Sequence, residues 1–233
     1  MKKIILLFTM SLLAGIYADN RRYVWTYEYQ TMTTGEAELE HYLTFQGNDR
    51  ENTKDAVKVS HNLELEIGMN SRFDVGIYQN FSQNPGEAFQ YDGFKVRTRY
   101  RIGEKGQYLA DPLLYFEYKS NTDFSKHAYE GKLILARDFG LINVALNPVF
   151  EIETHDGNTE MMWKYNAGMS KRIHPLFSLG LEFRGNKDHQ YLGPVLSHGK
   201  DGLWIALGSA FAVTNVLEGV DPFKIRMIIG IHF

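Results

Sequence analysis

Two sets of charged residues could do chemistry in this chain, because each places its charges at every second position. The acidic residues are Glu36, Glu38, Glu40, Glu64 and Glu66. The basic residues are Lys95, Arg97, Arg99 and Arg101. Side chains two positions apart share one face of an extended strand, and like charges placed there repel one another unless opposite charges neutralise them. We expect the acidic set and Glu117 to be the partners of the basic set.

The expected pairing of the acidic and basic sets has two interpretations, which the sequence leaves open. The charges can form a structural network of ion pairs that fills and stiffens the interior of a small barrel. Alternatively, acidic and basic walls can face one another across a pore, where their field would select and orient polar or charged solutes.

A hydrolytic site is not predicted. Ser197 and His198 are neighbours, but adjacent residues of a strand point to opposite faces and make a poor catalytic dyad. The chain contains no Gly-x-Ser-x-Gly sequence. His155 and His189 each adjoin an aspartate in an expected loop, and without the spacing of a metal motif we interpret them as exposed loop histidines. We therefore expect no catalytic residues, no metal and no cofactor.

The charged residues lie within a series of strand-like runs. In residues 57–69, Val57, Leu63 and Ile67 fall on one face, and Lys58 and Glu64 fall on the other. This period of two predicts a strand with one apolar and one polar side. The run is longer than the usual five or six residues of a globular strand, and it suits a tilted membrane strand. Residues 223–233 alternate in the same way and end on Ile231, His232 and Phe233.

The amino terminus predicts export. Lys2 and Lys3 precede an apolar stretch over residues 4–13, and Ala18 is a suitable residue for cleavage. A membrane anchor is the alternative, but the stretch is too short to cross ~30 Å of hydrocarbon as a helix. We therefore expect a signal peptide at residues 1–18 and one barrel domain at residues 19–233.

Composition narrows the function further. The chain has no cysteine, so no disulfide can hold it together. A net charge of −3 argues against a nucleic-acid partner. The 14 Tyr and 15 Phe suit aromatic belts at membrane interfaces, and we assign Trp25, Trp163 and Trp204 to the same belts.

Alternating strands also occur in soluble sandwiches and soluble closed barrels, which remain the alternatives. Long strands, the export signal and an alternation of turn lengths favour an all-β, antiparallel, up-and-down transmembrane barrel. Short turns are expected near residues 70, 104, 139 and 172, and longer polar loops near residues 50, 85, 156 and 218.

The carboxy-terminal Ile231-His232-Phe233 is similar to the signal that the barrel-assembly machinery reads in outer-membrane β-barrel proteins of Gram-negative bacteria. Residues 33–40 resemble the opening of small porins of the phenol-degradation MetA type. The resemblance implies a place in the bacterial outer membrane, with the lipid bilayer, the assembly machinery and small solutes as partners.

Thirteen strand-like runs can be counted, whereas single-chain bacterial barrels have even numbers of strands. We expect twelve, with residues 23–29 packed at the periplasmic rim or inside the barrel. The alternative is fourteen, with residues 127–137 misassigned. We also expect Gly208, Ala210 and Ala212 to leave space along one wall. The residues expected to line the lumen are Glu38, Glu40, Glu64, Glu66, Arg72, Asp74, Lys95, Arg97, Arg99, Arg101, Glu117 and Arg226.

The leading hypothesis is a small porin-like channel that passes small polar or charged solutes through a charged lumen. A non-conducting barrel with structural or adhesive loops is the second hypothesis, and an outer-membrane hydrolase is the third. The assignment of a function rests on analogy between folds more than on an identified site.

Overall fold

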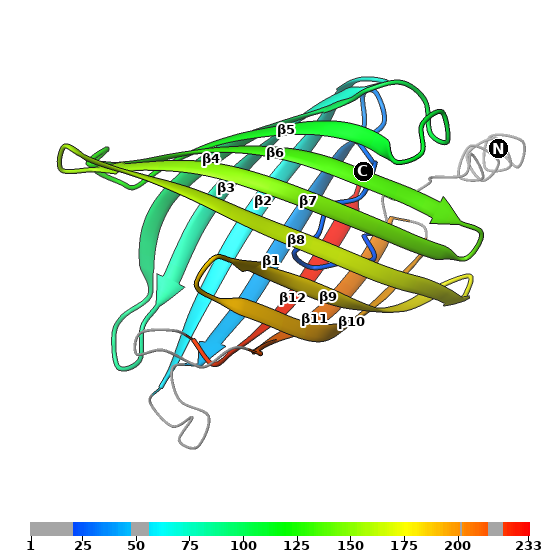
Figure 1. Cartoon of the computed structure of the whole chain (residues 1–233). Coiled ribbons are helices and arrows are strands. Elements are labelled where there is room, and N and C mark those ends of the chain that lie inside the picture. Colours follow the sequence, from blue (N-terminus) through cyan, green and yellow to red (C-terminus); the bar gives the residue numbers. More distant parts are fainter. Residues whose placement is uncertain (1–20, 48–55, 201, 214–220) are drawn as a thin grey trace, which may run out of the picture.

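A computed structural model describes residues 21–47, 56–200, 202–213 and 221–233 (Figure 1). The expected signal peptide lies outside them. No helix in the described part of the chain is long and apolar enough to cross a membrane. The chain forms twelve strands: β1 (Ala37–Gly47), β2 (Val57–Asn70), β3 (Phe73–Gln83), β4 (Gln90–Arg101), β5 (Asp111–Ser120), β6 (Lys126–Phe139), β7 (Ile142–His155), β8 (Asn158–His174), β9 (Phe177–Asn186), β10 (Gln190–Lys200), β11 (Leu203–Ala212) and β12 (Phe223–His232).

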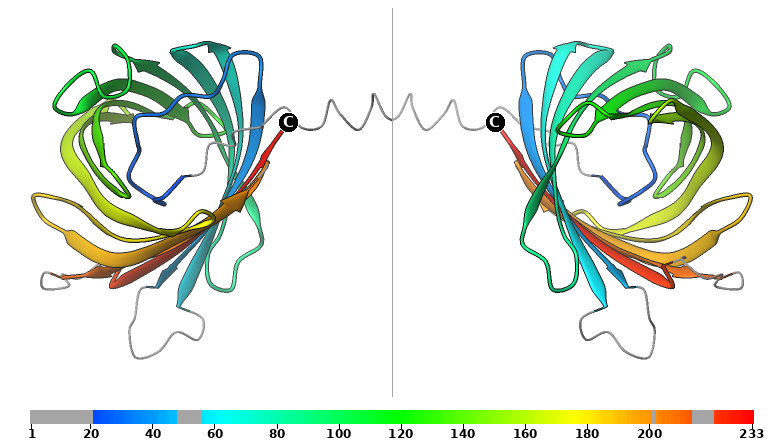
Figure 2. Two further views of the ribbon diagram at one scale, coloured as in Figure 1. Left: turned by 90° about the vertical axis from the view of Figure 1, so that its right-hand side faces the viewer. Right: turned by 90° about the vertical axis from the view of Figure 1, so that its left-hand side faces the viewer.

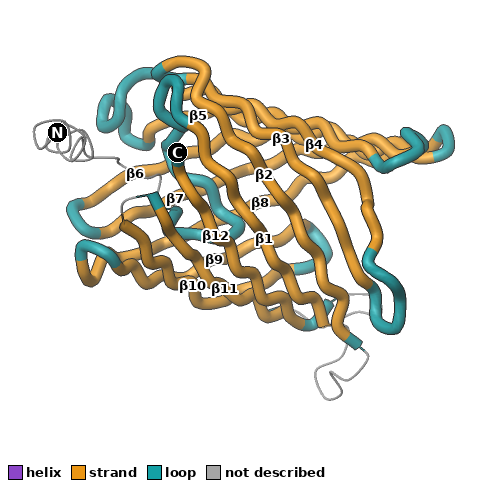
Figure 3. The backbone as a smooth tube through the Cα atoms, turned by 180° about the vertical axis from the view of Figure 1, so that it is seen from behind, coloured by secondary structure: helices purple, strands orange, loops and turns teal. Residues whose placement is uncertain are grey.

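Each strand pairs antiparallel with the next one in sequence, and β12 pairs with β1 to close the barrel (Figure 3). Glu38 of β1 lies opposite His232 of β12 on one side and Glu66 of β2 on the other. The closure reaches the last residue, because the backbones of Ala37 and Phe233 exchange two hydrogen bonds of 3.0 and 2.9 Å. The prediction of an up-and-down barrel with twelve strands is confirmed, and residues 127–137 belong to β6.

The apolar side of the strands faces outward. On β1, Leu39 is 44% exposed, whereas Glu38 and Glu40 on either side of it are each 1% exposed. The same alternation leaves Phe116 and Leu146 exposed on other strands. A soluble sandwich buries its apolar side, so this arrangement is the reverse of a sandwich and matches a barrel whose outer surface meets lipid.

Two connections differ from the predicted turn lengths. The connection near residue 104 runs from residue 102 to 110 and is long, whereas the one near residue 156 is only Asp156-Gly157. Both residues of that tight turn have positive φ angles, 49° and 79°, which suits the twist of a two-residue hairpin. We call the end of the barrel that carries Ala37, Phe233 and the β4–β5 connection the terminal end, and the opposite end the far end.

The amino-terminal segment, residues 21–33, lies inside the barrel and is not a strand. Figure 2 shows this part of the chain, in dark blue, within the ring of strands. Tyr23, Val24, Trp25 and Tyr29 are all buried and belong to the core of the molecule. The aromatic residues at alternate positions thus share an interior location rather than one face of a strand. We call residues 21–33 the inserted segment.

The tryptophans separate into two kinds. Trp163 is 69% exposed on the outside of β8, as expected for a membrane-interface residue. The same expectation is wrong for Trp25 and Trp204, which are 6% and 1% exposed inside the barrel. The alternation along β11 directs Trp204 inward, and its buried indole N–H donates to Glu38 of β1 at 2.8 Å.

Candidate functional site

The inserted segment is attached to the barrel wall chiefly through its backbone. The carboxylate of Glu182 on β9 accepts hydrogen bonds from three consecutive backbone N–H groups, those of Val24, Trp25 and Thr26, at 3.0, 2.9 and 2.7 Å. Irregular backbone inside a protein needs such partners, because it has no strand neighbour of its own. A carboxylate is a strong acceptor for several N–H groups at once.

Other side chains hold the segment along its length. Asn147 on β7 accepts the N–H of Tyr27 at 2.6 Å and donates to its carbonyl at 3.1 Å. The Tyr29 hydroxyl donates to the Gly103 carbonyl in the β4–β5 connection at 2.7 Å. At the end of the segment, Asp74 accepts the N–H of Met32 at 2.9 Å. The segment is therefore fastened to the wall on several sides.

Small residues on the wall make room for the segment. A Cβ atom added at Gly168 would meet the ring of Tyr23, and one added at Gly208 would meet the side chain of Val24. The sequence pattern predicts open space in the interior beside Gly208 and its small neighbours on β11. That prediction is wrong at Gly208, because Val24 of the inserted segment occupies the space beside it.

A buried ion network lies beside the segment. Arg97 on β4 contacts three carboxylates: Glu64 at 2.5 Å, Glu66 at 2.7 Å and Asp74 at 3.2 Å. Arg99 contacts Asp74 at 2.7 Å and also contacts Glu66. All five side chains are almost completely buried. The predicted pairing of acidic and basic rows therefore exists, with β3 supplying Asp74 between them.

Both arginines of this ion network are already paired with carboxylates. Each guanidinium is surrounded by carboxylates, so little of its charge is left to act on a solute. Oxygens of Glu40, Glu64 and Glu66 lie within 4.8 Å of one another. Arg97 contacts the last two, and Arg21 of the inserted segment lies 3.3 Å from Glu40. Each carboxylate of the cluster is therefore already paired with an arginine.

The other residues predicted to line the lumen or to form the assembly signal lie in different parts of the barrel. Lys95 pairs with Glu117 at 2.9 Å inside the barrel. Arg72 lies at the terminal rim, partly exposed, where it pairs with Glu104 at 2.5 Å. Arg101 lies near the ring of Tyr29, 5.6 Å from its centre. The two residues of the expected assembly signal, Ile231 and Phe233, are 50% and 70% exposed.

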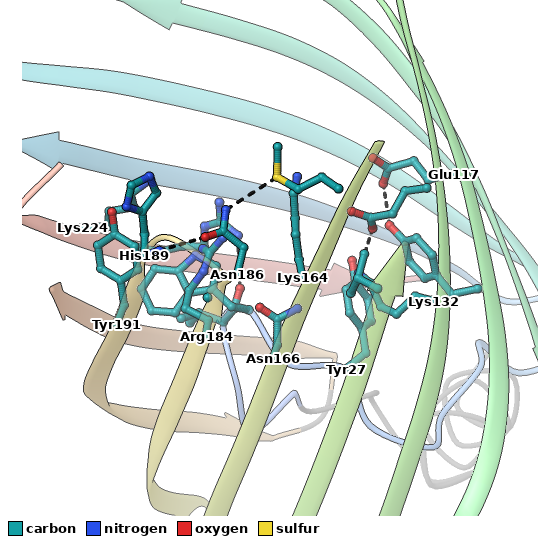
Figure 4. A pocket seen from close by; sticks show the side chains of 18 of the residues that line it. Tyr27, Glu117, Lys132, Lys164, Asn166, Arg184, Asn186, His189, Tyr191 and Lys224 are labelled. Carbon is teal, nitrogen blue, oxygen red and sulfur yellow. Dashed lines mark hydrogen bonds and ion pairs between the residues drawn. The ribbon is translucent and has the colours of Figure 1, made fainter. Parts of the chain in front are cut away.

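A cavity of about 410 Å³ lies between the inserted segment and the far end (Figure 4). Its wall is formed by Val24, Trp25, Tyr27, Tyr42, Lys95, Tyr115, Glu117, Glu130, Lys132, Val149, Met162, Lys164, Asn166, Arg184, Gly185, Asn186, His189, Tyr191, Lys224 and Arg226. We call it the far cavity. Six of these residues are Lys or Arg and two are Glu.

The lysines of the far cavity all have acidic partners. The pairs are Lys95–Glu117, Lys132–Glu130, Lys164–Glu151 and Lys224–Asp221, at 2.9, 3.1, 2.5 and 2.9 Å. Among the described residues, no carboxylate lies within ion-pair distance of Arg184 or Arg226. Arg226 instead donates to Thr44 at 2.9 Å and to the Val24 carbonyl at 3.2 Å. The surplus positive charge of the far cavity therefore belongs to the two arginines.

The sequence pattern does not single out Arg184, although this residue lies on the polar face of its strand with Glu182. Only the fold makes its position distinctive. The guanidinium carbons of Arg184 and Arg226 lie 5.4 and 5.5 Å from the centre of the same Trp25 ring. These residues come from β9, from β12 and from the inserted segment, so no sequence spacing could have brought them together.

A second cavity, of about 500 Å³, opens on the other side of the inserted segment. Its wall is formed by Arg22, Glu28, Tyr29, Gln30, Thr33, Arg101, Lys105, Asp111, Ala136, Arg137, Asp138, Asn143, Arg172 and Pro175. We call it the terminal cavity. The inserted segment separates it from the far cavity, with Tyr27 lining one and Glu28 the other.

The residues considered for hydrolysis do not assemble. Ser197 is buried inside the barrel, whereas the His198 ring packs outside against Phe177, 5.7 Å away. His155 is exposed, as expected, but it is the last residue of β7 and not a loop residue, and it lies 3.2 Å from Asp156. His189 lies in the β9–β10 connection, as expected of a loop residue, but it is not exposed: it lines the far cavity with a buried Nδ1 atom that has no partner.

No protein family and no curated protein matches the sequence. Solved structures do match the fold. The NanC porin aligns with a TM-score of 0.59 and 10% identity over 84% of this chain and 98% of that one. The KdgM porin aligns with a TM-score of 0.58 and 10% identity over the same shares of the two chains. The chain has the fold of an outer-membrane β-barrel.

Outer-membrane barrels of other kinds share this fold. Outer membrane phospholipase A from Escherichia coli aligns with a TM-score of 0.51 and 12% identity over 96% of this chain and 97% of that one. A porin and a phospholipase both match this chain, with similar TM-scores and similar sequence identity. An outer-membrane barrel fold alone therefore does not assign an activity. The likeness of residues 33–40 to phenol-degradation porins stays a prediction.

Proposed function

We propose that this protein is a small channel of the bacterial outer membrane, and that the inserted segment constricts its lumen. The terminal end would face the periplasm and the far end the cell exterior. Small polar or charged solutes would enter the far cavity, pass the inserted segment and leave through the terminal cavity.

The observation that carries the proposal is the pair of polar cavities on either side of one short segment. A barrel built only for mechanical strength would fill its interior with packed side chains, as small barrels do. Here the interior is filled at the level of the ion network and the inserted segment, while cavities of about 410 and 500 Å³ remain on the two sides. The segment is therefore the element that would control passage.

One observation favours a second function, a barrel that does not conduct. The inserted segment is held by Glu182, Asn147 and Asp74. Arg97 and Arg99 of the ion network beside it are paired with carboxylates. If the segment never moves, the two cavities stay separate. The protein would then serve as a structural barrel, with its far-end loops as the exposed surface.

Single-channel recording in planar bilayers tests the proposal. The folded protein should give discrete conductance steps, and a variant that frees the segment (Glu182→Gln combined with Asn147→Ala) should give larger or longer openings. Folding is checked independently by the shift in gel mobility on heating. If both proteins fold but neither conducts, the channel is excluded and the non-conducting barrel stands.

A further inference from the structure

We propose that Arg184 and Arg226 form a binding site for the carboxylate of a small organic solute, on the surface of Trp25 in the far cavity. The inference deepens the proposed function and rests on it, since a solute would reach the site while entering the channel. It names the part of the lumen that would hold the solute and the chemical class that would be held.

The charges of the far cavity point to an anion. Its lysines are neutralised by neighbouring carboxylates, and only the two arginines have no acidic partner among the described residues. The guanidinium carbons of both arginines lie within 5.5 Å of the centre of one indole ring, so an anion beside that ring would be attracted by both positive charges. In the part of the chain that the structure describes, the far cavity thus has two positive groups beside one ring and no carboxylate paired with either of them.

Glu182 is the nearest acidic residue in the sequence, because it lies two positions before Arg184 on the same strand. Its two oxygens are already engaged, since one accepts the N–H of Val24 and the other accepts those of Trp25 and Thr26. The hydrogen bonds that hold the inserted segment therefore occupy this carboxylate. This leaves Arg184 directed toward the cavity instead of into an ion pair (Figure 4).

A second observation is independent of charge. The indole Nε1 of Trp25 is buried and has no hydrogen-bond partner, although the side chain lines the cavity. An indole nitrogen can only donate, and a buried donor without an acceptor costs about 1–3 kcal/mol. His189, which lines the same cavity, also has a buried ring nitrogen without a partner. A ligand with carboxylate and hydroxyl oxygens would supply an acceptor for the indole N–H and, through a hydroxyl group, a partner for either tautomer of the imidazole.

The shape of the site favours an organic carboxylate over a simple inorganic anion. A guanidinium binds a carboxylate through two parallel hydrogen bonds, which a point charge does not require. The cavity of about 410 Å³ is far larger than one small ion needs. Asn166 and Tyr191 add polar groups for hydroxyls of the solute, and Val149 and Met162 add apolar surface for its carbon skeleton.

Calorimetric titration of the folded protein in detergent micelles tests the site at low ionic strength. The probes are glucuronate, glucose as its uncharged counterpart, and inorganic phosphate. We expect saturable binding of glucuronate, no binding of glucose and at least tenfold weaker binding of phosphate. Arg184→Gln should weaken glucuronate binding at least tenfold, whereas the matched control Arg72→Gln, at the terminal rim, should leave it unchanged.

Three results would overturn the site: equal binding of glucose and glucuronate, equal loss in the two arginine variants, or no binding by protein shown to be folded. Because titration in micelles needs no conduction, the two proposals fail separately. Binding without conductance would remove the channel and keep the site. Conductance without binding would keep the channel and remove the site.

Discussion

The carboxylate of Glu182 accepts the backbone N–H of Trp25 at 2.9 Å, although 157 positions separate the two residues in the chain. This contact and its neighbours at Val24 and Thr26 connect the middle of β9 to a segment that precedes the first strand. The amino-terminal segment is thereby held inside the barrel, where it separates the two cavities and brings Trp25 beneath Arg184 and Arg226.

The first prediction concerns this attachment. Glu182→Gln should lower the stability of the barrel and increase its conductance, because an amide offers one neutral acceptor oxygen to three N–H groups. Each charge-assisted hydrogen bond that is lost costs roughly 1.5–3 kcal/mol. Thermal unfolding and single-channel recording measure the two effects. The control is Glu160→Gln at an exposed position of β8, and an equal response of the two variants would contradict the assigned role of Glu182.

The second prediction concerns the ion network. Arg97→Gln should destabilise the protein by about 3–5 kcal/mol, because removing one partner leaves several carboxylates buried without compensation. Arg72→Gln, which removes a partly exposed pair at the rim, should cost at most about 1 kcal/mol. Denaturant unfolding in micelles compares the two variants. A large change of ion selectivity with unchanged stability in the first variant would show instead that Arg97 lines the conducting path.

The third prediction concerns the fit between wall and segment. Gly208→Ala should destabilise the barrel by about 1–3 kcal/mol, because the new methyl group meets the side chain of Val24. Val24→Ala in the same protein should recover much of that loss, since it removes the atoms in conflict. A double-mutant cycle measures the coupling between the two positions. Gly131→Ala, where the added methyl group meets nothing, is the control, and additive effects at positions 24 and 208 would refute the contact.

The fourth prediction concerns the outer surface. Leu63→Arg, on the exposed apolar side of β2, should impair insertion into lipid vesicles and lower stability by about 2–4 kcal/mol if the residue lies near the bilayer centre. Leu109→Arg, in the β4–β5 connection, should insert as the original protein does. Folding into vesicles is followed by the change in gel mobility. Normal insertion of the first variant would place this face away from lipid.

Local pattern is sufficient for much of this architecture. Alternation at every second position locates the strands, and it places Glu38 and Leu39 on opposite sides of one strand. It also predicts that the acidic row of β2 and the basic row of β4 are partners. These inferences succeed because the direction of a side chain in a strand depends only on its own position along that strand.

The weakest local pattern misleads in places. Tyr23 and Tyr29 lie at alternating positions that suit a strand, and only the even number of strands predicted that this stretch packs at the rim or inside the barrel, where the structure places it. Tryptophan is common in membrane-interface belts, which favours a belt position for Trp204, but the alternation along β11 directs it inward, where Glu38 accepts its N–H. Composition indicates where a residue type is common, whereas the position along its own strand determines whether one particular side chain faces inward or outward.

The amino-acid sequence by itself is enough to indicate the class of fold and the polar character of the interior, since both follow from short-range periodicity. Periodicity gives thirteen strand-like runs, and only the rule that single-chain barrels have even numbers of strands favours twelve. Only the folded barrel determines the path of residues 21–33. It also determines the pairing of Arg97 with three carboxylates and the position of Arg184 and Arg226 beside the Trp25 ring. Those contacts join residues far apart in the chain, and closing the sheet with a particular register between β1 and β12 sets which distant side chains face each other.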